Sequence, residues 1–244
     1  MNFKFDFHHK ILTILESLNG DLLRESFAYF GGGTLIALDY GEYRQSKDID
    51  FLCPVALSGY KNLRSIIFDR GYEGLFRNLN DFKIQRATTD QYGIRMAINV
   101  AGIVIKTEII AEERFPLDSP RYPHWSPVPC LSHNDCFTAK LLANSDRYLD
   151  DSVTSRDLID LAILRLHSSL PQLAIEKAEQ AYEVIRPLAA AIKRFQSRPD
   201  YRQKCYASLQ IDNSQIPIII DGIDLLANDL DLASTERTFL EQLF

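Results

Sequence analysis

The spacing of apolar residues predicts a mixed α/β first half of the chain. Apolar side chains recur at helical intervals in residues 8–19, and similar spacing predicts helices over 34–40 and 59–70. Acidic and apolar residues alternate in 48–55, which predicts a strand. Residues 74–111 are rich in β-branched side chains and interrupted by glycines, which predicts antiparallel strands with short connections.

The second half has a helical pattern. Five prolines in residues 115–129 predict a linker. Helical spacing recurs in four later segments, which are 132–148, the stretch from Thr154 or Ser155, 171–197 and the tail from 216. Pro187 predicts a kink or a break in the third of these.

Length and composition are those of an ordinary globular protein. The chain has 244 residues, of which 46% are hydrophobic and 25% charged. The patterns favour an α/β domain over 1–126 followed by a helical domain over 127–244. The expected fold class is α+β, with a mixed sheet flanked by helices.

Charge and targeting signals narrow the range of functions. The net charge of −6 argues against a general nucleic-acid coat, but not against one local basic patch. The first residues lack a signal-peptide cleavage site, and no apolar run reaches the length of about eighteen that a membrane span needs. The four scattered cysteines lack the partners of a zinc site. We therefore expect a cytoplasmic protein with reduced thiols and no membrane partner.

Two acids in the strand over 48–55 are candidate metal ligands. Asp48 and Asp50 are two residues apart, so both carboxylates project from one face of a strand. Two oxygen donors on a rigid face make a partial site for Mg²⁺. The alternative is that these acids form only the solvated face of the strand.

The sequence GGGT at 31–34 strengthens the metal interpretation. It offers backbone N–H groups without side chains, near the start of a short helix, where anions bind favourably. It is not a Walker A loop, because no Gly-Lys-Ser/Thr follows. A plain tight turn is the structural alternative. Glu108, in the apolar sequence IVIKTEII, is a candidate third acid, although an ion pair with Lys106 at a sheet edge explains it nearly as well.

The segment GGGTLIALDYGEYRQSKDIDFL, residues 31–52, resembles the signature of AbiEii/AbiGii-type nucleotidyltransferase toxins, which belong to the DNA polymerase β-like superfamily. Later motifs have a similar order, with Lys140 on a helix, Arg147 two turns on, and RDLID at 156–160. The resemblance covers roughly 27–166. It departs from the pattern at Glu108, where many superfamily members have Asp.

The resemblance implies a polymerase β-like fold and transfer of NMP from an NTP to a hydroxyl acceptor, with Mg²⁺ or Mn²⁺ as cofactor. The implied metal ligands are Asp48, Asp50 and Glu108, of which Glu108 either completes the metal site or polarises the attacking hydroxyl. The implied catalytic set is Asp48, Asp50, Glu108, Lys140 and Asp157. The implied nucleotide-binding set is Gly32, Gly33, Thr34, Ser46, Lys140, Arg147 and Asp160. For Asp157 and Asp160, the capping and ion pairing of an amphipathic helix is the alternative role.

A basic stretch in the second half suggests an acceptor. KRFQSRPDYRQKCY, residues 193–206, interleaves aromatic residues with five cations, which are Lys193, Arg194, Arg198, Arg202 and Lys204. Such a stretch suits RNA, although a solvated helix end is the simpler interpretation. Toxins that the chain resembles modify tRNA ends and are restrained by an antitoxin, so the expected partners are an NTP, a tRNA 3′ end and an antitoxin protein.

Two other functions fit the same residues. The acceptor could be a small molecule, such as an aminoglycoside, or a protein hydroxyl. The chain could instead be an inactive homologue that binds a nucleotide or a partner. The presence of Asp48, Asp50, Lys140 and Asp157 weighs against inactivity.

Overall fold

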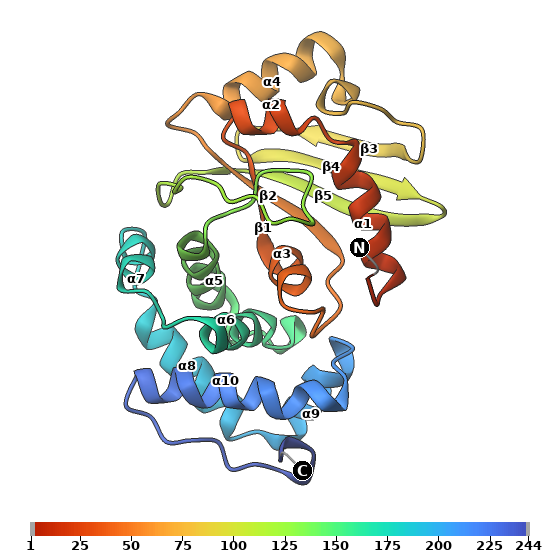
Figure 1. Cartoon of the computed structure of the whole chain (residues 1–244). Helices are drawn as coiled ribbons and strands as arrows, with labels where there is room; N and C mark the ends of the chain where they lie inside the picture. The colour runs from red at the N-terminus through yellow and green to blue at the C-terminus, as the bar shows by residue number, and fades with distance from the viewer. Residues whose placement is uncertain (1–2, 243–244) are drawn as a thin grey trace. The chain divides into compact units, whose positions relative to one another are not determined.

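The computed structural model describes residues 3–242 and divides into two compact units (Figure 1). Unit 1 holds the chain up to Asp39 and residues 46–132, and unit 2 holds residues 40–45 and the chain from His133 onwards. The chain therefore leaves unit 1 after Asp39 and returns to it at Ser46. No helix in the described part of the chain is long and apolar enough to cross a membrane.

The sequence-based boundary after residue 126 lies within unit 1. Residues 127–132 stay with this unit because their backbone pairs with its first strand. Phe30 donates its N–H to the carbonyl of Pro129 at 2.8 Å, and Leu131 donates to the carbonyl of Phe30 at 2.9 Å. The end of the proline-rich segment is thus hydrogen-bonded to the first strand of unit 1.

Unit 1 is built on a five-stranded sheet with the order β1-β2-β5-β4-β3. The strands are β1 (Tyr29–Gly31), β2 (Asp48–Pro54), β3 (Lys83–Thr89), β4 (Gly93–Val100) and β5 (Ile103–Glu112). β2 and β5 run parallel, and the other neighbouring pairs run antiparallel. The structure thus has the predicted mixed sheet, and adds the short strand β1, which the sequence pattern did not predict.

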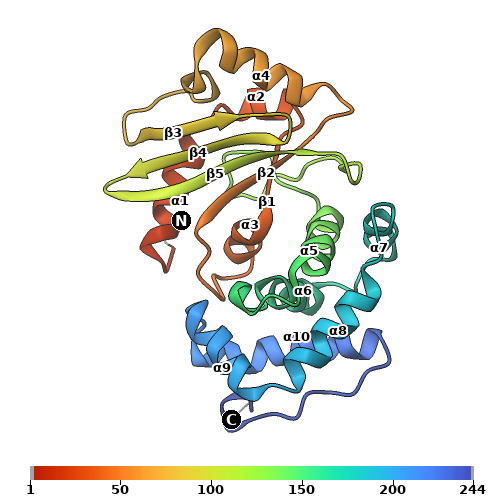
Figure 2. The same cartoon turned by 180° about the vertical axis from the view of Figure 1, so that it is seen from behind.

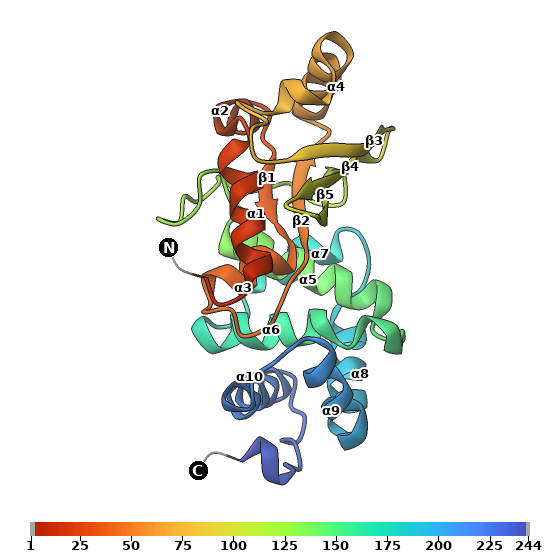
Figure 3. The same ribbon diagram turned by 90° about the vertical axis from the view of Figure 1, so that its right-hand side faces the viewer.

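The two faces of this sheet differ in chemistry. One face is apolar, because Ile49, Phe51, Ile105 and Ile109 are buried there, and helix α1 (Asp6–Ser17) lies against one side of the sheet (Figure 3). In Figure 2 the strands β3, β4 and β5 lie in front of α1, and no helix of unit 1 covers them from this side. The second face carries the residues at alternate positions, among which Asp48, Asp50, Arg95, Lys106 and Glu108 are half-buried or exposed.

Unit 1 contains three further α-helices and a 3₁₀ turn among its described residues. They are α2 (Gly20–Glu25), α3 (Gly32–Asp39), α4 (Gly59–Arg70) and the 3₁₀ turn η1 (Tyr72–Leu75). The bounds of α4 are those predicted from apolar spacing. α3 begins two residues earlier than predicted, so Gly32 and Gly33 form its first turn instead of preceding it.

All secondary-structure elements assigned to the described residues of unit 2 are helices, as predicted for the second half of the chain. Its α-helices are α5 (His133–Arg147), α6 (Arg156–His167), α7 (Gln172–Glu179), α8 (Ile185–Gln196), α9 (Pro199–Ser208) and α10 (Ile216–Asp229). Its 3₁₀ turns are η2 (Asp151–Val153), η3 (Asn213–Gln215) and η4 (Phe239–Glu241). The break expected near Pro187 falls at 180–184, and the proline lies in the first turn of α8, where its missing N–H costs little.

Helix α6 is the centre of unit 2. Its residues from Leu158 to Leu164 are all buried, and α5, α8 and α10 pack around it. α10 comes so close that a Cβ on Gly222 would lie 2.4 Å from the carbonyl oxygen of Ala162. Asp157 and Asp160 are buried along the first turns of this apolar helix, so both carboxylates require partners within the protein.

Candidate active site

The two acids of β2 share a face of the sheet, as the strand period requires. Asp48 and Asp50 are half-buried, whereas Ile49 and Phe51 are fully buried on the opposite side. The apolar side chains fix the strand in the core. The two carboxylates therefore stand on a rigid support and point away from that core.

The glycine sequence lies directly beside one of these acids. Gly31, the last residue of β1, pairs in register with Asp50. Gly32 has a φ of +69°, and a Cβ built on it would lie 2.6 Å from Asp50 Oδ2. An L side chain at this position would be both strained and in conflict with the carboxylate. The structure thus brings the side-chain-free start of α3 against the Asp50 carboxylate.

Thr34 and Ser46 form hydrogen bonds at the start of β2. The buried Thr34 hydroxyl donates to the carbonyl oxygen of Asp48 at 2.5 Å and lies 2.8 Å from the Ser46 hydroxyl. The backbone N–H of Ser46 donates to Nε2 of His8 at 3.0 Å. His8 is fully buried, and its Nε2 also lies 3.1 Å from the carbonyl oxygen of Ser46, so one ring nitrogen contacts both backbone groups of Ser46. No sequence signal singled out His8, because a lone histidine on a helix carries no motif.

Glu108 is the neighbour of Asp50 on the parallel strand β5. The two residues are in register, so their side chains share the second face of the sheet. The Glu108 carboxylate lies 3.2 Å from Nε of Arg95 and also pairs with Lys106. Among residues 3–242 no group of three or more His, Cys, Asp or Glu side chains is arranged to hold a metal ion. Strand register nevertheless places Asp48, Asp50 and Glu108 on the same face of the sheet.

Unit 2 holds the remaining predicted residues in one buried ion network. Asp160 accepts from Arg44 Nε at 2.6 Å, from Arg44 Nη2 at 2.8 Å and from the Tyr43 hydroxyl at 2.5 Å. Lys140 Nζ lies 2.7 Å from Asp160 and 2.8 Å from Asp157. Arg147 makes two bonds to Asp157, at 2.6 and 2.9 Å. Lys140 is thus a bridge between the two aspartates of α6.

This network is fully ionised at neutral pH. Burial raises the pKa of Asp160, but the charges of Arg44 and Lys140 outweigh it and hold that pKa below its ordinary value. Burial acts in the same way on Asp157, and Lys140 together with Arg147 lowers its pKa below the ordinary range. Burial alone would lower the pKa of Lys140, but the two aspartates raise it. Three cations and two anions leave the network with an excess of one positive charge.

Tyr43 and Arg44 are site residues to which sequence reasoning gave no role. Both lie in the 40–45 segment that belongs to unit 2. Arg44 lies within the segment 31–52 that carries the family resemblance. The pattern could not show that its partner is Asp160, which is 116 positions away.

The basic stretch at 193–206 is only partly a surface. Arg202 is fully buried and pairs with Glu241, at 2.6 Å for the closest atoms, so it cannot contact RNA in this fold. Arg194 and Arg198 both pair with Asp151. The interleaved aromatics Phe195, Tyr201 and Tyr206 are buried as well, and only Lys193 and Lys204 among the five cations are well exposed.

Comparisons with known proteins bear on the family and the fold of the chain. The family model described as nucleotidyl transferase AbiEii toxin, type IV TA system, matches residues 13–237. The crystal structure of JHP933 from Helicobacter pylori has a TM-score of 0.51 and 18% identity, and covers 94% of this chain and 95% of that chain. A second H. pylori structure, assigned as a nucleotidyltransferase, has a TM-score of 0.50 and 20% identity, and covers 91% and 95%. A comparison with curated proteins finds no match. The structural likenesses confirm the expected α+β fold.

Proposed function

Because this chain belongs to the AbiEii family of nucleotidyl transferase toxins, as its sequence predicted, we propose that it transfers a nucleoside monophosphate from an NTP to a tRNA 3′ end. Family membership makes the protein a nucleotidyltransferase of a type IV toxin–antitoxin family. The NTP, the metal dependence and the RNA acceptor are our proposal, and observations within each unit support it.

One observation carries most of the proposal. The backbone at Gly32 lies against the carboxylate of Asp50, and Asp48 projects from the same face of β2. The first turn of α3 offers N–H groups to an anion, and the strand beside it offers oxygen ligands to a cation. A polyphosphate with a bound divalent cation suits both groups, because the phosphates carry negative charge for the N–H groups and the cation carries positive charge for the carboxylates.

The donor set fits a metal of the Mg²⁺ type. Magnesium takes one or two carboxylates and completes its shell with water and phosphate oxygens, so Asp48 and Asp50 suffice as protein ligands. When bound there, such an ion supplies charge neutralisation to the phosphate oxygens during transfer.

The protein's own groups supply positioning. The amides at 32–34 orient the phosphates, and the bonds among Thr34, Ser46 and His8 fix the start of the strand that carries both acids. An acceptor hydroxyl oxygen then forms a bond to the α-phosphorus, while the bond from that phosphorus to the bridging oxygen breaks and pyrophosphate leaves. Glu108, next to Asp50, takes the proton of the hydroxyl.

For unit 2 we propose a role for the three cations of its buried ion network. Asp157 holds Lys140 and Arg147 together, and Asp160 holds Lys140 and Arg44. Fixed cations of this kind are suited to the negative charge that develops on a leaving pyrophosphate. The buried aspartates keep these cations charged and oriented.

A nucleotide-transfer assay tests the proposal. The protein is incubated with each α-labelled NTP and total tRNA, with Mg²⁺, with Mn²⁺ or with a chelator. We expect metal-dependent label in tRNA with the wild type and none with Asp48→Asn. Asp69→Asn, at an exposed acid of α4, is the matched control and should retain transfer. Label in a protein or a small molecule but in no RNA would refute the proposed acceptor.

Toxicity provides a second, independent readout. Expression of the wild type should arrest bacterial growth, and Asp48→Asn should relieve the arrest at the same protein level. Co-expression of the protein encoded beside it should restore growth if that neighbour is the antitoxin. Equal toxicity of both forms would show that growth arrest does not depend on nucleotide transfer.

A further inference from the structure

Three rows of side chains cross the uncovered face of the sheet. Strand register places Asp48, Lys106, Ala97 and Arg86 in one row, and Asp50, Glu108, Arg95 and Thr88 in the next. A third row places Val104 beside Asn99 and Lys83. Each row on β5, β4 and β3 contains a cation, and the first two rows begin at the acids of β2.

The charge on this face changes sign across the strands. β2 contributes the two acids, whereas β5, β4 and β3 contribute the four cations of these rows, which are Lys83, Arg86, Arg95 and Lys106. Glu108 is the one acid of the rows on those three strands. On β5, β4 and β3 the rows thus hold four cations and one acid, although the net charge of the whole chain is −6.

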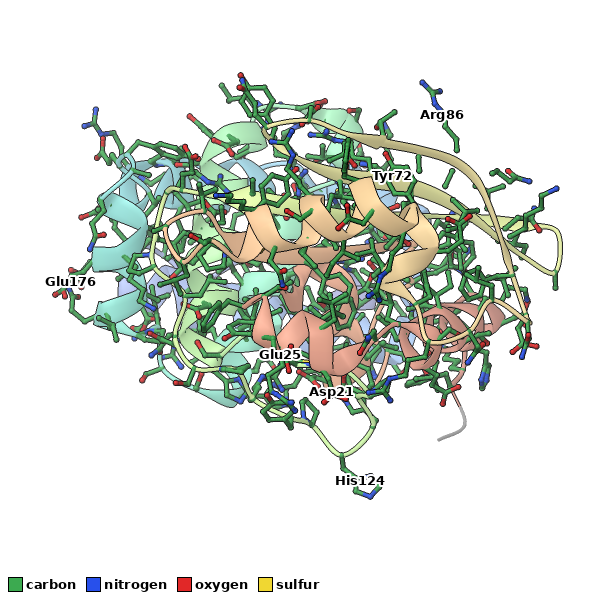
Figure 4. All side chains as sticks on the ribbon, turned by 90° about the horizontal axis from the view of Figure 1, so that it is seen from above. Asp21, Glu25, Tyr72, Arg86, His124 and Glu176 are labelled. Carbon is green, nitrogen blue, oxygen red and sulfur yellow. The ribbon has the colours of Figure 1, made fainter. Side chains whose placement is uncertain are left out.

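The cations at the outer edge are available to a ligand. Lys83 and Arg86 are exposed, and no ion pair to either is present within residues 3–242. Figure 4 shows the Arg86 side chain projecting away from the molecule. Nearer the acids, the side chains of Arg95 and Lys106 remain 40% and 58% exposed, although both pair with Glu108 and Arg95 also pairs with Asp90.

Edge protection does not account for the whole cluster. Charged residues on an edge strand discourage pairing with other chains, which explains Lys83 and Arg86 on β3. Arg95 and Lys106 lie on β4 and β5, which are paired on both sides, so edge protection does not require them. A ligand with several negative charges accounts for all four cations.

We propose that this face, defined by Lys83, Arg86, Arg95 and Lys106, binds the phosphodiester backbone of the acceptor RNA and leads its 3′ end to Asp48 and Asp50. The inference rests on the proposed function, since it assigns a location to the acceptor. Three strand spacings separate Arg86 from Asp48, about 14 Å, which several nucleotides of an extended strand can span. Ala97, between Lys106 and Arg86, leaves space for the backbone above the sheet.

Binding at this face also bears on Glu108. In the structure its carboxylate is engaged by Arg95 and Lys106. Phosphate oxygens of an arriving strand compete for these same two cations. The acceptor would thereby release the Glu108 carboxylate at the moment when its own hydroxyl arrives.

Paired charge reversals test this assignment. Lys83→Glu with Arg86→Glu removes two outer cations that take no part in the proposed chemistry. Lys193→Glu with Lys204→Glu is the matched control, at the two well-exposed cations of the other basic stretch. The probe is a tRNA acceptor-stem hairpin with an unpaired 3′ end, and binding is measured across a range of salt concentrations, together with steady-state transfer.

We expect the sheet-face variant to weaken hairpin binding and raise the RNA KM by about tenfold or more, and to lower the salt slope by about 1.4. Its KM for NTP and its kcat at saturating RNA should stay at wild-type values, as should all values for the control variant. If the wild type transfers label to RNA but the sheet-face variant binds it equally well, this assignment fails while the proposed function stands. If the sheet-face variant alone loses RNA binding but the wild type transfers nothing, the proposed function fails and the binding face stands.

Discussion

The backbone of Gly32 and the carboxylate of Asp50 occupy adjoining space, such that a methyl group on Gly32 would lie 2.6 Å from Asp50 Oδ2. Gly32→Ala should therefore displace the Asp50 side chain and reduce transfer by at least about 100-fold, the scale of effect that small misplacements produce. Gly102→Ala is the control, because Gly102 also has a positive φ but no neighbouring atom within 4 Å of its Cβ position. Both variants carry a similar backbone strain of about 1 kcal/mol. Equal activity of the two would show that the Gly32 contact has no function.

Glu108 and Asp50 should differ in how their loss affects metal dependence. Glu108→Gln should lower kcat by about 100-fold or more, the usual contribution of a general base, and leave the Mg²⁺ concentration at half-maximal rate unchanged. The measurement is transfer rate against Mg²⁺ concentration. A large rise in that concentration would make Glu108 a metal ligand instead of a proton acceptor.

Lys140 should be essential for the stability of unit 2 as well as for any role in transfer. Lys140→Met removes the cation that bridges Asp157 and Asp160, and loss of one partner in a buried ion pair typically costs about 3–5 kcal/mol. Urea unfolding should show this loss. Lys193→Met, at an exposed position on α8, should change the unfolding free energy by less than about 0.5 kcal/mol. Wild-type stability for Lys140→Met would mean that the network is not formed in solution.

The pair formed by Arg202 and Glu241 predicts a pH dependence of stability. Burial raises the pKa of Glu241, but hydrogen bonds from Arg202, the Thr238 N–H and Tyr206 lower it to about 2, from 4.5. Because the folded-state pKa is the lower one, the ionised carboxylate stabilises the fold above about pH 4.5, and this contribution disappears as the pH falls toward 2. It amounts to about 3 kcal/mol at neutral pH.

The difference in unfolding free energy between wild type and Glu241→Gln should consequently shrink from pH 6 to pH 3. Glu25→Gln, at an exposed glutamate labelled in Figure 4, supplies the baseline and should differ from wild type by a constant small amount. A Glu241→Gln difference that does not change with pH would contradict the low pKa.

Elements with their own local signal could be predicted from the sequence. The apolar spacing of α4 gave its bounds, and the alternation in β2 gave both the strand and the shared face of its two acids. Strand β1 was missed because three residues are too few to show a period, and its pairing with β2 is a long-range contact.

The ion-pair partners of charged residues could not be predicted from the sequence either, because these pairs are also long-range contacts. A basic residue in a sequence does not reveal whether it faces water or a buried acid. Arg202 was expected on an RNA-binding surface, but it pairs with Glu241, 39 positions later. The motif order assigned Lys140, Arg147, Asp157 and Asp160 to one proposed site, while their mutual ion pairing became visible only in the structure.

The central claim is that Asp48 and Asp50 together support metal-dependent nucleotide transfer, and one measurement tests it most directly. Single-turnover transfer of α-labelled NTP to tRNA is compared for wild type and Asp50→Asn, with the melting temperature recorded for both. We expect transfer to fall by about a thousandfold or more in the variant, since several kcal/mol of charge stabilisation is lost, while the melting temperature stays within a few degrees. Transfer by Asp50→Asn at the wild-type rate would place the active site elsewhere in the protein.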